Sequence, residues 1–218
     1  GMLAGLVTGW LHTKLMIPAI LAGILTMIAL WSVNIRVMGG TNVSLLGEDT
    51  ALTKVMDLLG VDQTLATLVV GVIIGAIVIA ALYWFFGTEI GCALRATGNN
   101  EFMVRALGGN TDTSKVLGLV ISNGLISVSG ALVAQNQGYG DIKMGTGSIV
   151  IGLASIVIGE VIFGKRFNFA YILASLIGGA MVYRMIISLV LHFGLSTDDM
   201  KLFTAIIVAL ALGIPAVS

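Results

Sequence analysis

Long runs of apolar residues constrain this chain more than any other feature. A bilayer core about 30 Å thick is crossed by a helix of ~20 mostly apolar residues. Six runs qualify in whole or in part: 17–35, 64–86, 116–134, 148–163, 169–191 and 202–217. Residues 1–11 form a further apolar stub. The pattern predicts an all-α fold, a polytopic transmembrane helix bundle of about six spans plus the N-terminal helix stub.

The composition supports a lipid environment and excludes several classes of protein. Hydrophobic residues make up 57% of the chain and charged residues 10%, whereas soluble domains carry about 25% charged residues. So few charged residues cannot cover the surface of a water-soluble fold of this size, and the composition therefore excludes a soluble enzyme, a nucleic-acid binder and a disordered chain. The single cysteine, Cys92, excludes an intrachain disulfide and a cysteine metal cluster. We therefore treat residues 1–218 as a single transmembrane domain. Because both ends fall within apolar runs, we expect it to be a fragment.

The loops between the runs alternate in charge, which indicates their orientation. One set of loops holds six Lys and Arg residues against three Asp and Glu, and the other holds four against seven. Cytoplasmic loops carry the excess of Lys and Arg. This rule places the loop 87–115 in the cytoplasm and the loop 39–63 outside.

The outer loop 39–63 contains apolar residues at helical spacing. They are Leu52, Val55, Met56 and Leu59. Glu48 and Asp49 precede them, where a helix N-terminus favours negative charge, and Gly60 suits the end of a helix. We expect a short helix on the outer surface. It either covers the end of the bundle or docks a partner, and the sequence leaves both open.

The inner loop 87–115 predicts a two-turn helix. Asn99 or Asn100 can accept a hydrogen bond from a free N–H at its start, and Gly108 stops it. Phe102, Met103, Ala106 and Leu107 follow at helical spacing. Two turns are not stable alone in water, so the helix needs a surface to bind. Either Phe102 and Met103 meet a partner, with Arg105 as a charged anchor, or the helix packs on its own bundle.

This loop also carries a family resemblance. The stretches Leu94-Arg-Ala-Thr-Gly-Asn-Asn100 and Arg105-Ala-Leu-Gly-Gly-Asn110 resemble the cytoplasmic coupling region of bacterial ABC importer permeases. The subgroup handles branched-chain amino acids, ribose and related solutes, and permeases paired with tryptophan/tyrosine-type binding proteins are the most similar. The segments 129–135 and 147–160 also resemble this family. The resemblance covers roughly 6–215.

The resemblance implies partners and a function. Two cytoplasmic ATPase subunits would grip the coupling helices, a second permease chain would complete the pathway, and an extracytoplasmic binding protein would deliver the solute. ATP and Mg would bind to the ATPases, so this chain would hold no cofactor or metal and perform no catalysis. It would lie in the bacterial inner membrane and move a small solute, first of all an amino acid. The implied ATPase-coupling residues are Asn99, Asn100, Glu101, Phe102, Met103, Arg105, Leu107 and Gly108.

A second group of residues is polar, charged or small within the spans. These candidates for the translocation path are Asn123, Gln135, Gly152, Gly159, Glu160 and Arg184. Charges inside a span cost roughly 2.5–3.5 kcal/mol on insertion scales, so Glu160 and Arg184 need a cavity or a partner. Simple spans place these two at different depths, and they meet only if 148–163 is re-entrant. Asn123 and Arg184 also have structural interpretations, as helix-to-helix bonding and as bonding to helix carbonyls or snorkelling.

Two other classes of function would leave their own marks in the sequence. An ion-coupled secondary transporter without ATPase subunits would show several carboxylates within its spans, and this chain has Glu160. An intramembrane enzyme would need a nucleophile, paired acids or a metal site at suitable spacing.

The pairs Gly5/Gly9 and Gly71/Gly75 share the Gly-x-x-x-Gly spacing that permits close helix contact.

Overall fold

The computed structural model describes residues 1–145, 148–163 and 169–192, and these ranges form nine helices and two short strands. The helices are α1 (Met2–Lys14), α2 (Ala19–Met38), α3 (Ala51–Leu59), α4 (Gln63–Phe86), α5 (Glu89–Asn99), α6 (Glu101–Ala106), α7 (Thr111–Gln137), α8 (Ser148–Phe163) and α9 (Phe169–His192). The strands are β1 (Asn42–Ser44) and β2 (Tyr139–Asp141). The predicted all-α class is confirmed. The chain divides into two compact units, Gly1–Met144 and the residues from Gly145 onward, and each is described by itself.

Four helices in the described ranges are long and apolar enough to cross a membrane. They are α2, α4, α7 and the segment Tyr171–Leu189 of α9. This number is lower than the six spans expected. Helix α8 has the predicted bounds, but its 16 residues rise only about 24 Å at 1.5 Å per residue. The run 202–217 lies outside the described residues.

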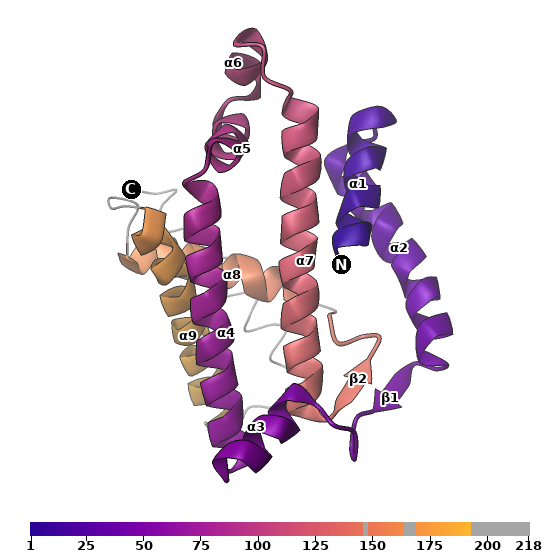
Figure 1. The fold of residues 1–218 in the computed structure, drawn as a ribbon, viewed down its shortest axis with the longest axis vertical. Coiled ribbons are helices and arrows are strands. Elements are labelled where there is room, and N and C mark those ends of the chain that lie inside the picture. Colours follow the sequence, from indigo (N-terminus) through magenta and orange to yellow (C-terminus); the bar gives the residue numbers. More distant parts are fainter. Residues whose placement is uncertain (146–147, 164–168, 193–218) are drawn as a thin grey trace. The chain divides into compact units, whose positions relative to one another are not determined.

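Helix α1, predicted as the stub, packs along the N-terminal half of α7 within the first unit (Figure 1). Glycines make this approach possible. A Cβ atom at Gly5 would overlap the carbonyl oxygen of Leu119, and one at Gly9 would lie 3.0 Å from the Cα of Val116. Backbone therefore meets backbone along the helix pair. On the other side of α1, the hydroxyl of Thr8 donates to that of Thr26 on α2 at 2.8 Å.

The outer-loop end of the first unit is held by short elements. Strands β1 and β2 pair antiparallel, with Asn42 opposite Asp141. The predicted helix of the outer loop is α3. Thr50, rather than an acidic residue, caps it in a reciprocal box with Thr53, and Gly60 ends it at φ +61°.

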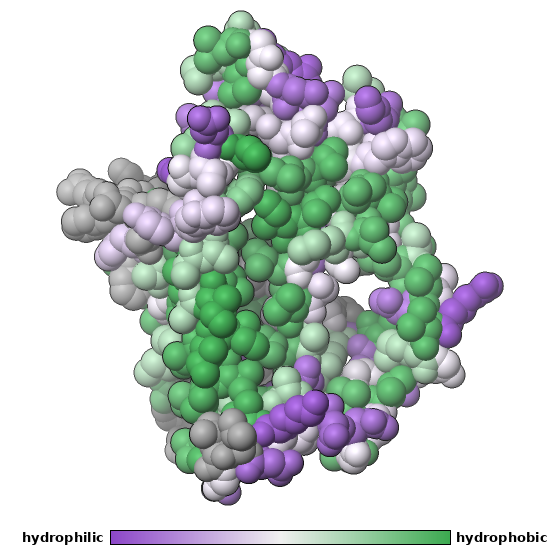
Figure 2. All heavy atoms as spheres, viewed as in Figure 1, coloured by the Kyte–Doolittle hydropathy of each residue, from purple (hydrophilic) through white to green (hydrophobic). Residues whose placement is uncertain are grey.

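Apolar and polar side chains separate along the first unit in the view of Figure 2. Apolar side chains cover the lengths of the helices, and hydrophilic ones gather near α5 and α6 at one end and near α3 and the strands at the other. Exposed apolar residues along α2, α4 and α7 include Ile28, Ile73 and Ile126. A helix surface of this kind is stable in lipid, where apolar side chains face hydrocarbon.

In the second unit, α8 and α9 cross at small residues. A Cβ at Gly159 would lie 2.5 Å from the carbonyl oxygen of Ser175, and one at Gly179 would overlap that of Ser155. This contact continues into a buried cluster of Ala154, Ile158, Tyr183 and Ile187. The two helices thus form a tight pair.

Candidate functional site

Local chemistry explains why α6 forms. Asn100 adopts an extended conformation, and its Oδ1 accepts a hydrogen bond from the backbone N–H of Met103 at 3.0 Å. Of the two asparagines considered, Asn100 is therefore the cap, and Asn99 is the last residue of α5. The helix ends before Gly108, which has φ +83°, a conformation that glycine adopts without strain. The predicted two-turn helix is confirmed.

One face of α6 consists of apolar side chains that contact little of the described chain. Phe102 is 86% exposed, Leu107 80% and Met103 51%, whereas Val104 is buried. A fixed apolar patch of this kind, beside charged residues, indicates a binding surface for another molecule. We call Phe102, Met103 and Leu107 the apolar knob.

The opposite side of α6 is bound to the first turn of α7 by charged and polar groups. The Oε1 atom of Glu101 lies 2.7 Å from Nζ of Lys115 and 2.9 Å from Nη2 of Arg105. Nη2 of Arg105 also lies 3.0 Å from Oδ1 of Asp112. Arg105 Nε donates to the hydroxyl of Thr111 at 2.7 Å, and that hydroxyl donates to Glu101 Oε1 at 3.3 Å. We call these five residues the bracket. Arg105 thus bonds to its own chain.

The electrostatics of the bracket favour the ionised carboxylate. The hydrogen bond from the Lys115 ammonium holds the pKa of Glu101 below its ordinary value of 4.5; burial opposes this shift, and the charges of Lys115 and Arg105 reinforce it. A carboxyl whose pKa is lower in the folded state stabilises the fold at pH values above the pKa that it has in the unfolded chain. That contribution is lost as the pH falls through the lowered value. The bracket is therefore intact at neutral pH.

Helix α5, which was not predicted, precedes α6. The Thr88 side chain caps it by accepting from Gly91 N–H at 3.2 Å. Gly91 itself fits against the carbonyl of Phe85, where a Cβ would overlap. Farther along, the side chain of Leu94 packs over Gly118 of α7. Leu94 and Gly118 are distant in the chain, and Gly91 meets Phe85 across the junction of α4 and α5. Only the Thr88 cap is readable as a local signal.

Two of the candidate path residues lie on α7. The side-chain amide of Asn123 donates to the carbonyl of Leu119 in its own helix at 2.9 Å. The Oε1 atom of Gln135 is buried and has no hydrogen-bond partner among the described residues. Twelve residues separate the two, or about 18 Å along the helix, so they do not form one cluster.

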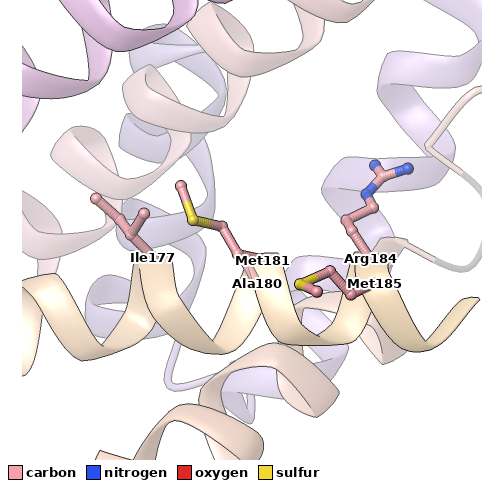
Figure 3. Close-up of a pocket in the computed structure, with 5 residues that line it drawn as sticks. All are labelled: Ile177, Ala180, Met181, Arg184 and Met185. Atoms are coloured by element: carbon pink, nitrogen blue, oxygen red, sulfur yellow. The ribbon is translucent and has the colours of Figure 1, made fainter. Parts of the chain in front are cut away.

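The other four candidates lie in the second unit. Gly159 is part of the contact between α8 and α9, and Glu160 beside it is half-buried; a Cβ at Gly152 would meet no described atom within 4 Å. Arg184 lies five residues beyond Gly179, about 7.5 Å farther along α9. It therefore lies at a different level from Glu160. Arg184 lines a hollow of about 500 Å³ with Ile177, Ala180, Met181 and Met185 (Figure 3).

Comparison with known proteins places the chain. Residues 1–214 match the family described as branched-chain amino acid transport system, permease component. The chain belongs to this permease family. The permease is 38% identical over 215 residues to the tyrosine transport system permease protein of Clostridioides difficile (strain R20291), covering 95% of this chain and 67% of the relative. It is 32% identical to an uncharacterized protein of Rickettsia prowazekii (strain Madrid E), covering 97% of this chain and 74% of the relative. No solved structure matches it.

Membership and structure agree on the general role. The family is one of permease components, and the helices α2, α4, α7 and α9 have the length and apolarity of membrane spans. The permease is thus a multi-pass membrane protein and a transport subunit. The resemblance inferred from the coupling loop is confirmed.

Proposed function

We propose that this permease is the membrane subunit of an ATP-driven ABC importer in the bacterial cytoplasmic membrane, and that it moves an amino acid. Its partners would be two cytoplasmic ATPase subunits, a second permease chain and an extracytoplasmic binding protein. ATP and Mg would bind to the ATPases. The apolar knob of α6 is the observation that carries this proposal.

The geometry of α6 supports an ATPase contact. A two-turn helix is unstable alone, yet α6 is capped by Asn100 and held by the bracket, while Phe102 and Leu107 protrude. Binding surfaces concentrate energy in a few such anchors. A capped helix with a protruding apolar face has no evident purpose in a carrier that works alone.

The solute is proposed from the relatives and from two candidate path residues, each considered in its own unit. The name of the C. difficile relative assigns tyrosine to that protein, and an amino acid of this kind is the first solute to test here. The Gln135 Oε1 atom on α7, which has no hydrogen-bond partner within the described ranges, is an acceptor suited to an ammonium group. Arg184 on α9 is a cation suited to a carboxylate.

Reconstituted transport tests this proposal. The full-length chain, purified from its host with whatever ATPase accompanies it, would be placed in liposomes with its binding protein. We expect uptake of labelled tyrosine or a branched-chain amino acid that requires ATP and persists without an ion gradient. Uptake driven by a proton or sodium gradient in the absence of ATP would instead establish an ion-coupled carrier.

A further inference from the structure

We propose that Glu101 is a positioning residue that makes α6 and the first turn of α7 one rigid body, so that displacement of α6 enters the membrane through α7. This inference rests on the proposed function, in which a partner pushes or pulls the apolar knob. It assigns a role to residues on the side of α6 that faces away from that partner.

Glu101 is the point where the bracket converges. Its Oε1 atom contacts cations from both helices, Arg105 of α6 at 2.9 Å and Lys115 of α7 at 2.7 Å. It also accepts from the hydroxyl of Thr111, which is only 2% exposed. Charge-assisted bonds of this length are the strong ones among hydrogen bonds. Two of the three bonds on this oxygen, from Lys115 and from the buried Thr111, cross to α7 and restrict how α6 can rotate against it.

The connection from α6 back to α5 is made by the backbone rather than by ion pairs. Asn100 is the single residue between the two helices, and its backbone N–H donates to Ala96 at 2.9 Å. Within the described residues, the ion pairs that α6 makes to another helix run to α7. Through these ion pairs, a displacement of the apolar knob is carried into α7.

Helix α7 also runs from α6 to the opposite end of the first unit, near α3. Near its start it is joined backbone to backbone with α1 through Gly5 and Gly9. Near its end, Asn136 Oδ1 accepts from Thr67 of α4 at 3.0 Å, and its carbonyl accepts from Gln63 Nε2 at 3.2 Å. Motion of α7 would thus displace α1 and would also act on the N-terminal end of α4.

A distance measurement tests the rigid body without any partner. Spin labels would replace Phe102 and the exposed Ser122 of α7 in the full-length chain, with the exposed Cys92 first changed to serine. We expect a narrow distance distribution in lipid nanodiscs for this parent protein. The distribution should broaden with Glu101→Gln and with Lys115→Gln. It should stay narrow with the control Glu89→Gln, which removes an exposed carboxylate on α5 instead. An unchanged width in both bracket variants would overturn the inference.

Transport supplies the second arm of the test, in unlabelled protein. We expect Glu101→Gln to lower the solute moved per ATP hydrolysed by roughly two- to thirty-fold, the range that network mutations produce on coupling. Loss of ATPase co-purification in this variant would overturn the inference, because Glu101 would then belong to the contact itself. Broadening with an unchanged transport ratio would overturn the inference. Broadening in a chain that moves solute without any ATPase would instead overturn the proposed function and leave the docking of α6 on α7 established.

Discussion

Gly5→Leu is expected to detach α1 from α7 and to destabilise the first unit. Even a Cβ at Gly5 would overlap the carbonyl oxygen of Leu119, which belongs to the backbone of α7. A helix backbone cannot yield as a side chain does, so the whole of α1 must move. We expect a loss of about 3 kcal/mol in the free energy of unfolding, the upper end of the range for overpacked sites. Unfolding in detergent measures this loss, followed by the fluorescence of Trp10 on α1 in a protein whose Trp31 and Trp84 are changed to Phe.

Gly71→Leu is the matched control. Gly71 and Gly75 repeat the spacing of Gly5 and Gly9 on α4, but a Cβ at either would meet no described atom within 4 Å. The same substitution should therefore leave the unfolding free energy within about 0.5 kcal/mol of the parent, as at other unencumbered surface positions. Equal losses at Gly5 and Gly71 would contradict the packing of α1 described above.

Phe102→Asp is expected to abolish ATP-driven transport while the bundle remains folded. Phe102 is 86% exposed, so its replacement removes few contacts within the chain. A buried aromatic anchor at an interface contributes on the order of 2 kcal/mol or more, about thirty-fold in affinity, and a buried unpaired carboxylate adds a further cost. Co-purification of the ATPase with the tagged chain measures the effect.

Leu46→Asp controls for the introduced charge. Leu46 is 83% exposed and belongs to the outer loop, between β1 and α3. The Leu46→Asp substitution should leave ATPase binding unchanged. If Phe102→Asp retains the ATPase as fully as Leu46→Asp does, the apolar knob is not the contact.

Helix positions were predictable where the signal is local. The bounds of α8 follow from an apolar run limited by polar residues, and α4 begins one residue from its predicted start. Asn100 and Gly108 delimit α6 because a cap and a left-handed glycine act within a few residues. In each case the residues that determine the structure lie next to each other in the chain.

Tertiary contacts set the features that were missed. Helix α5 depends on Gly91 meeting the Phe85 carbonyl, and strands of three residues such as β1 are too short to show alternation. Two identical glycine spacings behave differently because, among the described residues, a neighbouring helix lies against Gly5 and Gly9 and none lies against Gly71 and Gly75.

The bracket was only partly readable from the sequence. The pair of Glu101 and Arg105 has the i,i+4 spacing of helix ion pairs. Lys115 lies fourteen residues from Glu101, and the two meet because Gly108 reverses the chain at φ +83°. At Gly109 a Cβ would lie 2.6 Å from a side-chain carbon of Val104, so this turn is also closely packed. Arg105, predicted to anchor a partner, also bonds to Thr111 and Asp112 of its own chain.

Crosslinking in intact membranes tests the central claim, that α6 is the contact for an ATPase. A photoreactive amino acid would replace Phe102 in the full-length chain, and Leu46 in a parallel control. After illumination, we expect an adduct between position 102 and a soluble nucleotide-binding protein, and none from position 46. If position 102 forms adducts only with lipid or with the chain itself, in cells that transport the solute, the result would contradict the account.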